Sequence, residues 1–135
     1  MTNSFIQPQR KTDHRYERKF DNVEVAVSYL EADLWKDGSG YNKEYYARLL
    51  CRLRIRSQHE ERLRKVILAN IDKCYCREFG QYKRLAYKVD SPALRSEIKV
   101  RLNHENRHIR RHANWLVEYF IARDAQKKLR YIWQE

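Results

Sequence analysis

The sequence predicts an all-α protein, a compact bundle of five or six helices. Only 3 of its 135 residues are Gly and 2 are Pro, so turns are scarce and the elements between them must be long. Apolar residues recur at spacings of three and four, the period of an amphipathic helix. We expect a flexible basic arm at 1–20, holding Arg10, Lys11, Arg15, Arg18 and Lys19, and a single helical domain at 21–135.

The first two helices are predicted on either side of a glycine-containing loop at 37–40. Asp21 or Asn22 can cap the first, whose core stripe is Val23, Val27, Leu30 and Leu34. Asn42 can cap the second, whose inward positions are Tyr46, Leu49, Leu50 and Leu53. Residues 51–56 alternate between apolar and charged as a strand would, but the helical period runs into them, so we favour helix. Arg48, Arg52 and Arg56 would then form one basic stripe.

The middle of the chain predicts two further helices. Ser57 and Glu60 have the spacing of a capping box, in which each side chain bonds a backbone N–H near the helix start. The core stripe from there to about Phe79 is Leu63, Val66, Ile67, Asn70, Ile71 and Cys74, and Gly80 would end the helix. A short helix is possible over 81–89.

The last two helices follow a clear boundary at Asp90, Ser91 and Pro92, because proline suits the first helical position and restricts the residue before it. Leu94, Ile98 and Leu102 define a helix of about three turns. The final helix has Ile109, Ala113, Leu116 and Phe120 as its core stripe, continued by Leu129, Ile132 and Trp133.

An internal similarity suggests another arrangement. Residues 59–62 resemble residues 104–107, and Ala69–Asn70 resembles Ala113–Asn114, at shifts in the range of helical repeats. Residues 109–116 are similar to the second-helix signature of HEAT-type repeats. A short HEAT-like helical repeat is therefore the alternative to a bundle, although the sequence shows no third copy.

The net charge of +11 indicates a polyanionic partner, because a field of that sign attracts phosphate polymers. We expect a small nucleic-acid-binding protein that contacts phosphates, with RNA slightly favoured because Tyr and Trp can stack on unpaired bases. It could be a subunit of a ribonucleoprotein. The predicted contact residues are Arg48, Arg52, Arg56, Arg101, Arg107, Arg110, Arg111 and Trp115. The alternative is a protein–protein adaptor or inhibitor whose basic face docks on an acidic partner.

A zinc-dependent hydrolase is the second alternative, because His104, Glu105 and His108 match the His-Glu-x-x-His motif. Such a site needs both imidazoles on one helix face, a third ligand and an open position. Asn106 and the neighbouring arginines argue against it, and His104 follows what looks like a helix end. With no glycine-rich phosphate loop and no nucleophile motif, we expect no enzyme, no cofactor and no metal.

The remaining features concern location. Cys51 and Cys74 suit core positions as small hydrophobes, and Cys74-Tyr75-Cys76 lacks the usual spacing of a metal or redox pair. The first residues have no apolar stretch of signal-peptide length, and no run approaches a membrane span. We therefore expect a cytoplasmic protein with reduced thiols and no membrane partner.

Overall fold

The computed structural model describes residues 15–34, 39–73 and 79–134, and these form six α-helices, one 3-10 turn and no strand. The prediction of an all-α protein is confirmed. The helices are α1 (Arg15–Ala32), α2 (Ser39–Arg52), α3 (Ser57–Ile71), α4 (Phe79–Lys88), α5 (Pro92–Val100) and α6 (Arg107–Gln134). The 3-10 turn η1 (Arg101–Asn103) joins the last two.

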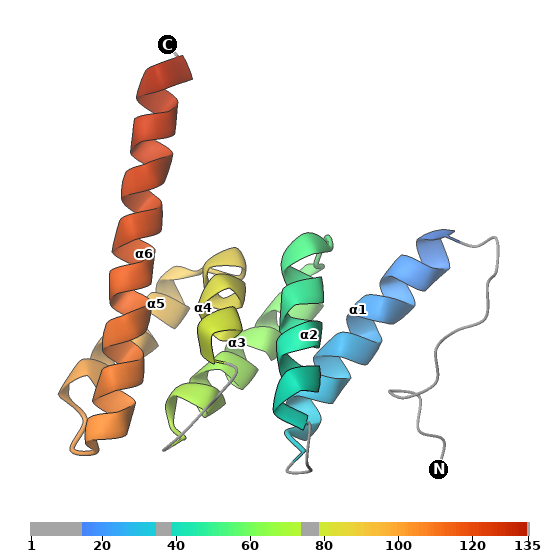
Figure 1. Ribbon diagram of the computed structural model, residues 1–135, viewed down its shortest axis with the longest axis horizontal. Coiled ribbons are helices and arrows are strands. Elements are labelled where there is room, and N and C mark those ends of the chain that lie inside the picture. The colour runs from blue at the N-terminus through green and yellow to red at the C-terminus, as the bar shows by residue number, and fades with distance from the viewer. Residues whose placement is uncertain (1–14, 35–38, 74–78, 135) are drawn as a thin grey trace.

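Consecutive helices pair as three hairpins, and the hairpins stack side by side. In Figure 1 each odd-numbered helix descends and each even-numbered helix ascends. The contacts run from α1 to α3 to α5 in one row and from α2 to α4 to α6 in the other. We call these rows the odd layer and the even layer. This order of packing is that of a helical-repeat stack, in which each hairpin contacts its neighbours.

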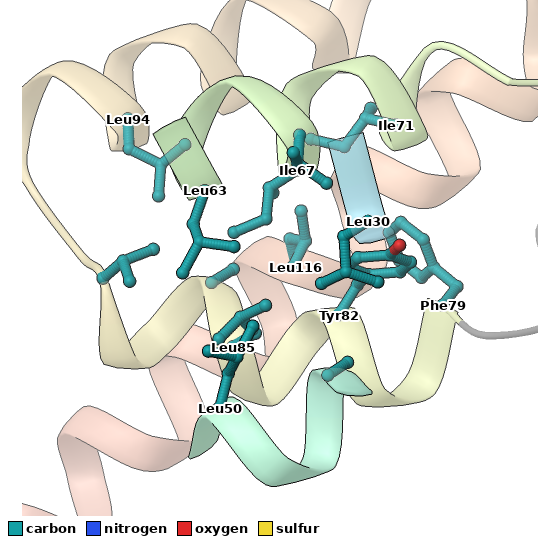
Figure 2. Packing of buried hydrophobic residues seen from close by; sticks show 14 of the residues in the cluster. Leu30, Leu50, Leu63, Ile67, Ile71, Phe79, Tyr82, Leu85, Leu94 and Leu116 are labelled. Atoms are coloured by element: carbon teal, nitrogen blue, oxygen red, sulfur yellow. The ribbon is translucent and has the colours of Figure 1, made fainter. Parts of the chain in front are cut away.

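The hydrophobic core lies between the two layers. Leu63, Ile67 and Ile71 of α3 face Tyr82 and Leu85 of α4 (Figure 2). The predicted stripe of the last helix is also buried, since Ile109, Ala113, Leu116 and Phe120 all lie in the core. Leu129, the predicted continuation, is instead 56% exposed. The core therefore ends near Phe120, and Figure 1 shows the rest of α6 extending past the other helices.

The first hairpin differs from the prediction at both of its ends. α1 begins at Arg15, not at Asp21, so the last part of the predicted arm is helical. Arg, Lys and Glu are good helix formers, and the absence of an apolar stripe does not prevent a helix from continuing. Residues 1–14 and 35–38 lie outside the described residues. α2 already includes Ser39 and Gly40, so the loop ends before the predicted cap at Asn42.

Asp33 ends α1 in the left-handed conformation, with φ of 50°. We predicted a glycine for this role, because an L side chain is strained there. The carboxylate of Asp33 accepts hydrogen bonds from Lys43, at 2.7 Å, and Lys73, at 2.5 Å. Burial would raise the pKa of Asp33, but these two ammonium groups outweigh it and the net shift is downward. Two ion pairs therefore hold the turn.

The predicted helix over the whole alternating segment at 51–56 is wrong, because only Cys51 and Arg52 are helical. α2 ends at Arg52, residues 53–56 lie outside any helix, and Arg56 is in extended backbone. Leu53 and Ile55 pack against the core while Arg52, Arg54 and Arg56 are exposed. The alternation therefore matches the burial of these side chains, but the segment forms no strand. The predicted capping box is also wrong, because Arg56 is the N-cap of α3 and makes no side-chain cap bond.

The boundary between α3 and α4 also differs, whereas the next one is confirmed. α3 ends at Ile71, and Gly80 lies within α4 instead of ending α3. Cys74 and Cys76 lie outside the described residues. At the next boundary, the Ser91 hydroxyl accepts a hydrogen bond from the backbone N–H of Leu94, and Pro92 is the first helical residue.

The sequence similarity at a shift of about 45 residues does not reflect the structural repeat. Residues 59–62 lie in the first helix of their hairpin, whereas residues 104–106 lie in the turn before the second helix of theirs, which begins at Arg107. The equivalent helices begin instead at Arg15, Ser57 and Pro92.

Candidate nucleic-acid interface

The positive charge of the chain is concentrated in one of the two layers. The even layer, α2, α4 and α6, contains 13 Lys and Arg against three carboxylates, a net charge of +10. The odd layer, α1, α3 and α5, contains eight Lys and Arg against seven carboxylates, a net charge of +1. The residues outside the six helices contain equal numbers of basic and acidic side chains. Nearly the whole net charge of +11 therefore lies on the even helices.

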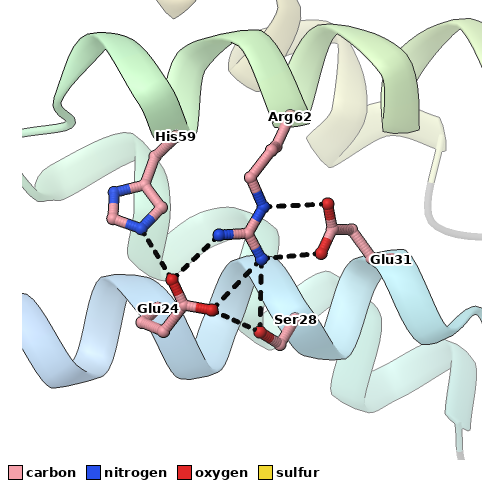
Figure 3. Close-up of polar contacts among 5 residues, drawn as sticks. All are labelled: Glu24, Ser28, Glu31, His59 and Arg62. Atoms are coloured by element: carbon pink, nitrogen blue, oxygen red, sulfur yellow. Dashed lines mark hydrogen bonds and ion pairs between the residues drawn. The ribbon is translucent and has the colours of Figure 1, made fainter.

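Arg62 and Arg64 of the odd layer are bound to carboxylates within the layer, whereas Lys65 and Lys99 are exposed. Figure 3 shows Arg62 of α3 between Glu24 and Glu31 of α1, with N···O distances of 2.9 Å and 2.7 Å. Ser28 accepts a further hydrogen bond from Arg62, and buried His59 meets the same Glu24 carboxylate at 2.9 Å. Hydrogen bonds from Arg62 and then His59 lower the pKa of Glu24 to about 2. These guanidinium contacts hold α1 to α3.

Two further arginines, Arg95 of α5 and Arg101 of η1, are also bound to carboxylates, one of which, Asp124, lies on α6 of the even layer. Arg95 of α5 pairs with Asp90 at 2.6 Å and with Asp124 at 3.0 Å. Arg101, one of the predicted contact residues, pairs with Asp72 at 2.8 Å and Glu97 at 3.0 Å. Because these carboxylates occupy its guanidinium, Arg101 serves to join η1 to the end of α3. We therefore remove it from the candidate interface.

Exposed cations of the even layer have no such partners among the residues that the structure describes. Within the part of the chain that the structure describes, Arg48, Arg52 and Arg84 are exposed and make no ion pair with a carboxylate. Two even-layer lysines are exceptions. Lys43 is buried against Asp33, and Lys88 donates to the backbone carbonyls of Cys51 and Leu53 at the end of α2. Burial lowers the pKa of Lys88.

The predicted contact residues lie toward the two ends of the even layer. Arg48 and Arg52 belong to the C-terminal half of α2, and Arg56 follows in the linker. Arg107, Arg110 and Arg111 belong to the first turns of α6, and α4 lies between α2 and α6 (Figure 1). They therefore do not form one continuous stripe. Arg107 and Arg111 are exposed, while Arg110 donates to the backbone carbonyls of His104 and Glu105.

α4, which the sequence reasoning left without any contact residue, fills the space between them. Lys83 and Arg84 lie on this helix, and Arg84 is exposed. Both α4 and α6 have aromatic and basic residues four positions apart, and this pattern is the signal that could have identified them. Where the two helices meet, these side chains form a single series. We call it the α4–α6 seam, formed by Phe79, Lys83 and Tyr87 of α4 and by Trp115, Tyr119, Arg123 and Lys127 of α6.

Contacts between rings and cations form two groups along the seam, one at Phe79 and Trp115 and one around Tyr87 and Tyr119. The Phe79 and Trp115 rings are 5.8 Å apart between centroids, and the Tyr87 and Tyr119 rings are 6.2 Å apart. The Lys83 ammonium lies 5.7 Å from the centre of the Tyr119 ring. Arg123 lies 5.6 Å and Lys127 4.7 Å from the centre of the Tyr87 ring.

The seam has aromatic support beneath it and one carboxylate beside it. Trp115, a predicted contact residue, is 41% exposed, and its ring lies against Phe79 and His112. Asp124 lies beside Tyr87, whose hydroxyl donates to it at 2.7 Å. Hydrogen bonds from Arg95 and then Tyr87 lower the pKa of Asp124. This carboxylate is therefore bound to Arg95 and Tyr87, and although its charge also attracts Lys127, it makes no ion pair with Arg123 or Lys127 among the described residues.

The His-Glu-x-x-His match does not form a zinc-hydrolase site. His104 is in extended backbone outside any helix, and its Nδ1 accepts the backbone N–H of Asn106 at 3.0 Å. Asn106 caps α6 by accepting from the N–H of His108 at 2.8 Å. The two imidazoles thus do not share a helix face. His112 is buried and its Nδ1–H donates to the Ile71 carbonyl at 2.9 Å, so it belongs to the core.

Among the described residues, no group of three or more His, Cys, Asp or Glu is arranged to hold a metal ion. None of the described helices combines the length and apolar character that crossing a bilayer requires. No protein-family model, curated protein or solved structure matches this chain.

Proposed function

We propose that this protein binds nucleic acid through the phosphate backbone, using the exposed side of the even layer. The observation that carries the proposal is the difference in net charge between the layers, +10 against +1. A protein that needed cations only for solubility would have no reason to place them on alternate helices. Segregated charge produces a directed field, and a polymer of phosphates is the partner that such a field attracts.

The state of the individual side chains supports this role. A guanidinium already bound to a carboxylate has little to offer a phosphate, because the new contact must replace the old one. Arg48, Arg52 and Arg84 have no carboxylate partner within the described residues and are exposed. They can form charge-assisted hydrogen bonds to phosphate without breaking an existing ion pair. Arg107 and Arg111 are also exposed, at the far end of the layer.

Exposed rings favour nucleic acid over an acidic protein. Tyr45 of α2 is 56% exposed and Trp115 of α6 is 41% exposed, both in the basic layer. Every base has a π face on which such rings can stack, whereas an acidic protein surface supplies mainly carboxylates. RNA is slightly favoured, because proteins that recognise RNA commonly stack aromatic side chains on its unpaired bases.

Charge reversal in one layer against the other tests the proposal. Arg48→Glu with Arg84→Glu alters two exposed even-layer cations, and Lys65→Glu with Lys99→Glu alters two exposed odd-layer cations. Both double variants lower the net charge by the same amount. We expect the even-layer pair to weaken binding of a fluorescent RNA by about tenfold or more and to lower the salt slope by about one per lost contact. The odd-layer pair should have a much smaller effect.

Two outcomes would contradict the proposal. Equal losses in the two double variants would mean that only net charge matters and that the even layer is no interface. Displacement of the RNA by polyglutamate at the same charge concentration would instead indicate an acidic protein as the partner. Circular dichroism of both variants controls for folding.

A further inference from the structure

We propose that the α4–α6 seam binds a single-stranded segment of nucleic acid, with bases stacked on Trp115, Tyr119 and Tyr87 and phosphates held by the seam cations. This inference rests on the proposed function and adds the class of ligand and its place. It concerns a different part of the even layer from the Arg48 and Arg84 pair. The chemistry is shared by single-stranded RNA and DNA, and the experiment includes both.

The spacing of the seam gives it a repeating character. Phe79, Lys83 and Tyr87 lie four residues apart along α4. Trp115, Tyr119, Arg123 and Lys127 do the same along α6. Side chains four apart stand one above another on a helix, about 6 Å apart along its axis. The α6 series therefore rises about 18 Å, which is long enough for a short run of nucleotides.

Trp115 is the best placed ring for a base. It is exposed, but it is not loose, because the Phe79 and His112 rings lie 5.8 Å and 5.7 Å from it between centroids. His112 is itself held by the Ile71 carbonyl and stacks on Phe79 at 4.5 Å. A ring that is fixed before binding loses little conformational freedom when a base stacks on it.

The seam cations are placed to hold phosphates beside that ring. Lys83, Arg123 and Lys127 lie over Tyr87 and Tyr119, and none of them has an ion pair among the described residues. A contact between a cation and an exposed ring is weaker than its pairing with a phosphate. These side chains can turn from the rings to phosphates, which also uncovers the Tyr87 and Tyr119 rings.

The rings decide between a single strand and a duplex. In a duplex the bases are stacked on one another, and the deep major groove of double-stranded RNA is closed to side chains. The exposed Trp115 ring and the partly buried Tyr87 and Tyr119 rings would then contact only the backbone. Unpaired bases, by contrast, offer free π faces to each of them.

The test compares ligands as well as variants. Fluorescence anisotropy measures binding of the full chain to oligouridine, to oligodeoxythymidine and to an RNA duplex of equal length. We expect both single strands to bind about tenfold or more tightly than the duplex. Trp115→Leu should weaken single-strand binding by about 5- to 100-fold and leave duplex binding unchanged, whereas Trp115→Phe, which keeps a ring, should stay within about threefold of the wild type.

A second variant and a cross-linking measurement keep the test decisive if Trp115→Leu does not fold. Lys83→Gln with Lys127→Gln removes two seam charges, and Lys65→Gln with Lys99→Gln is the matched odd-layer control. Only the seam pair should weaken single-strand binding. Ultraviolet cross-linking of 4-thiouridine RNA should place adducts on peptides containing Trp115 or Tyr119.

Different results would contradict the seam inference alone or the proposed function as well. Equal affinity for duplex and single strands, no effect of the seam variants and no adducts on the seam would overturn this inference. If Arg48→Glu with Arg84→Glu still weakened binding, the proposed function would stand. A wild-type protein that binds neither single strand nor duplex would overturn both.

Discussion

At the scale of single residues, the same side-chain type has two different roles in this protein. Arg62 is half-buried and makes ion pairs with Glu24 and Glu31, so it joins α3 to α1. Arg48 and Arg84 are exposed and have no carboxylate partner among the described residues. The first kind of arginine stabilises the fold, and the second kind is available to a ligand. Partner geometry, not residue type, distinguishes them.

Glu24 should make stability depend on pH in the acid range. Its pKa is about 2 in the folded protein and 4.5 in its reference state, so the folded protein holds the ionised form more strongly. The resulting stabilisation is complete above pH 4.5 and disappears as the pH falls toward 2. Because Glu24 is partly exposed, solvent screening reduces the effect, and we expect on the order of 1–2 kcal/mol.

Urea denaturation of Glu24→Gln at several pH values checks this. The variant should be less stable than the wild type at pH 7, and the gap should close as the pH falls toward 2. Glu61→Gln is the matched control, because this exposed carboxylate pairs only with Arg64 within the described residues. A gap for Glu24→Gln that is independent of pH would show that its charge is not the cause.

The limit of sequence reasoning is visible in the same residues. The cationic character of Arg48, Arg52 and Arg101 is evident from the sequence, but their pairing is not. Asp72, which binds Arg101, lies 29 residues away along the chain. A contact of that separation depends on the fold, so no local pattern could remove Arg101 from the predicted set. Trp115 could be predicted because it lies close to several arginines along the chain, and such a neighbourhood is visible in the sequence itself.

At the scale of elements, local chemistry decided some helix ends and long-range contacts decided others. Ser91 and Pro92 carry both signals of a helix start, and α5 begins there as predicted. The end of α1 depends instead on Asp33, which Lys43 and Lys73 hold in a left-handed conformation. Lys73 lies on the next hairpin, so the sequence around Asp33 gave no indication of this turn, and the nearby glycines were misleading.

Removing the Ser91 cap should destabilise the protein by about 1 kcal/mol. The hydroxyl of Ser91 accepts from the Leu94 backbone N–H at 3.1 Å, and Ser91→Ala leaves that donor without its partner. Ser96→Ala is the control, because Ser96 is exposed within the same helix and alanine is the better helix former there. Urea denaturation should show a loss for the first variant only. Equal effects of the two variants would mean that the cap contributes nothing.

At the scale of the whole molecule, the order in which the helices pack determines where the net charge lies. The charge of each helix can be counted from the sequence, but which helices lie side by side cannot. Alternate helices form one layer, and only this alternation brings the basic segments α2, α4 and α6 together. The value of +11 therefore predicted a polyanionic partner, whereas the face that meets the partner required the fold.

The same segregation should give the two layers opposite responses to salt. Added salt screens the ion pairs of the odd layer, which destabilises the fold, and screens repulsion among the even-layer cations, which stabilises it. Exposed ion pairs contribute only about 0–1 kcal/mol each. Since the even layer holds ten net charges, we expect relief of its repulsion to prevail. The free energy of unfolding should then rise by on the order of 1 kcal/mol between about 0.05 M and about 0.5 M NaCl.

The two charge-reversal pairs distinguish this origin from a general effect of salt on hydrophobic burial. Arg48→Glu with Arg84→Glu introduces carboxylates among the even-layer cations, so repulsion is already relieved and the gain with salt should shrink or reverse. Lys65→Glu with Lys99→Glu leaves the even layer intact and should keep the wild-type response. Urea denaturation at the two salt concentrations measures both. An identical salt response in the two double variants would show that repulsion among the even-layer cations contributes too little to the free energy of unfolding to be detected. These cations would then lie far enough apart for water to weaken their repulsion without added salt.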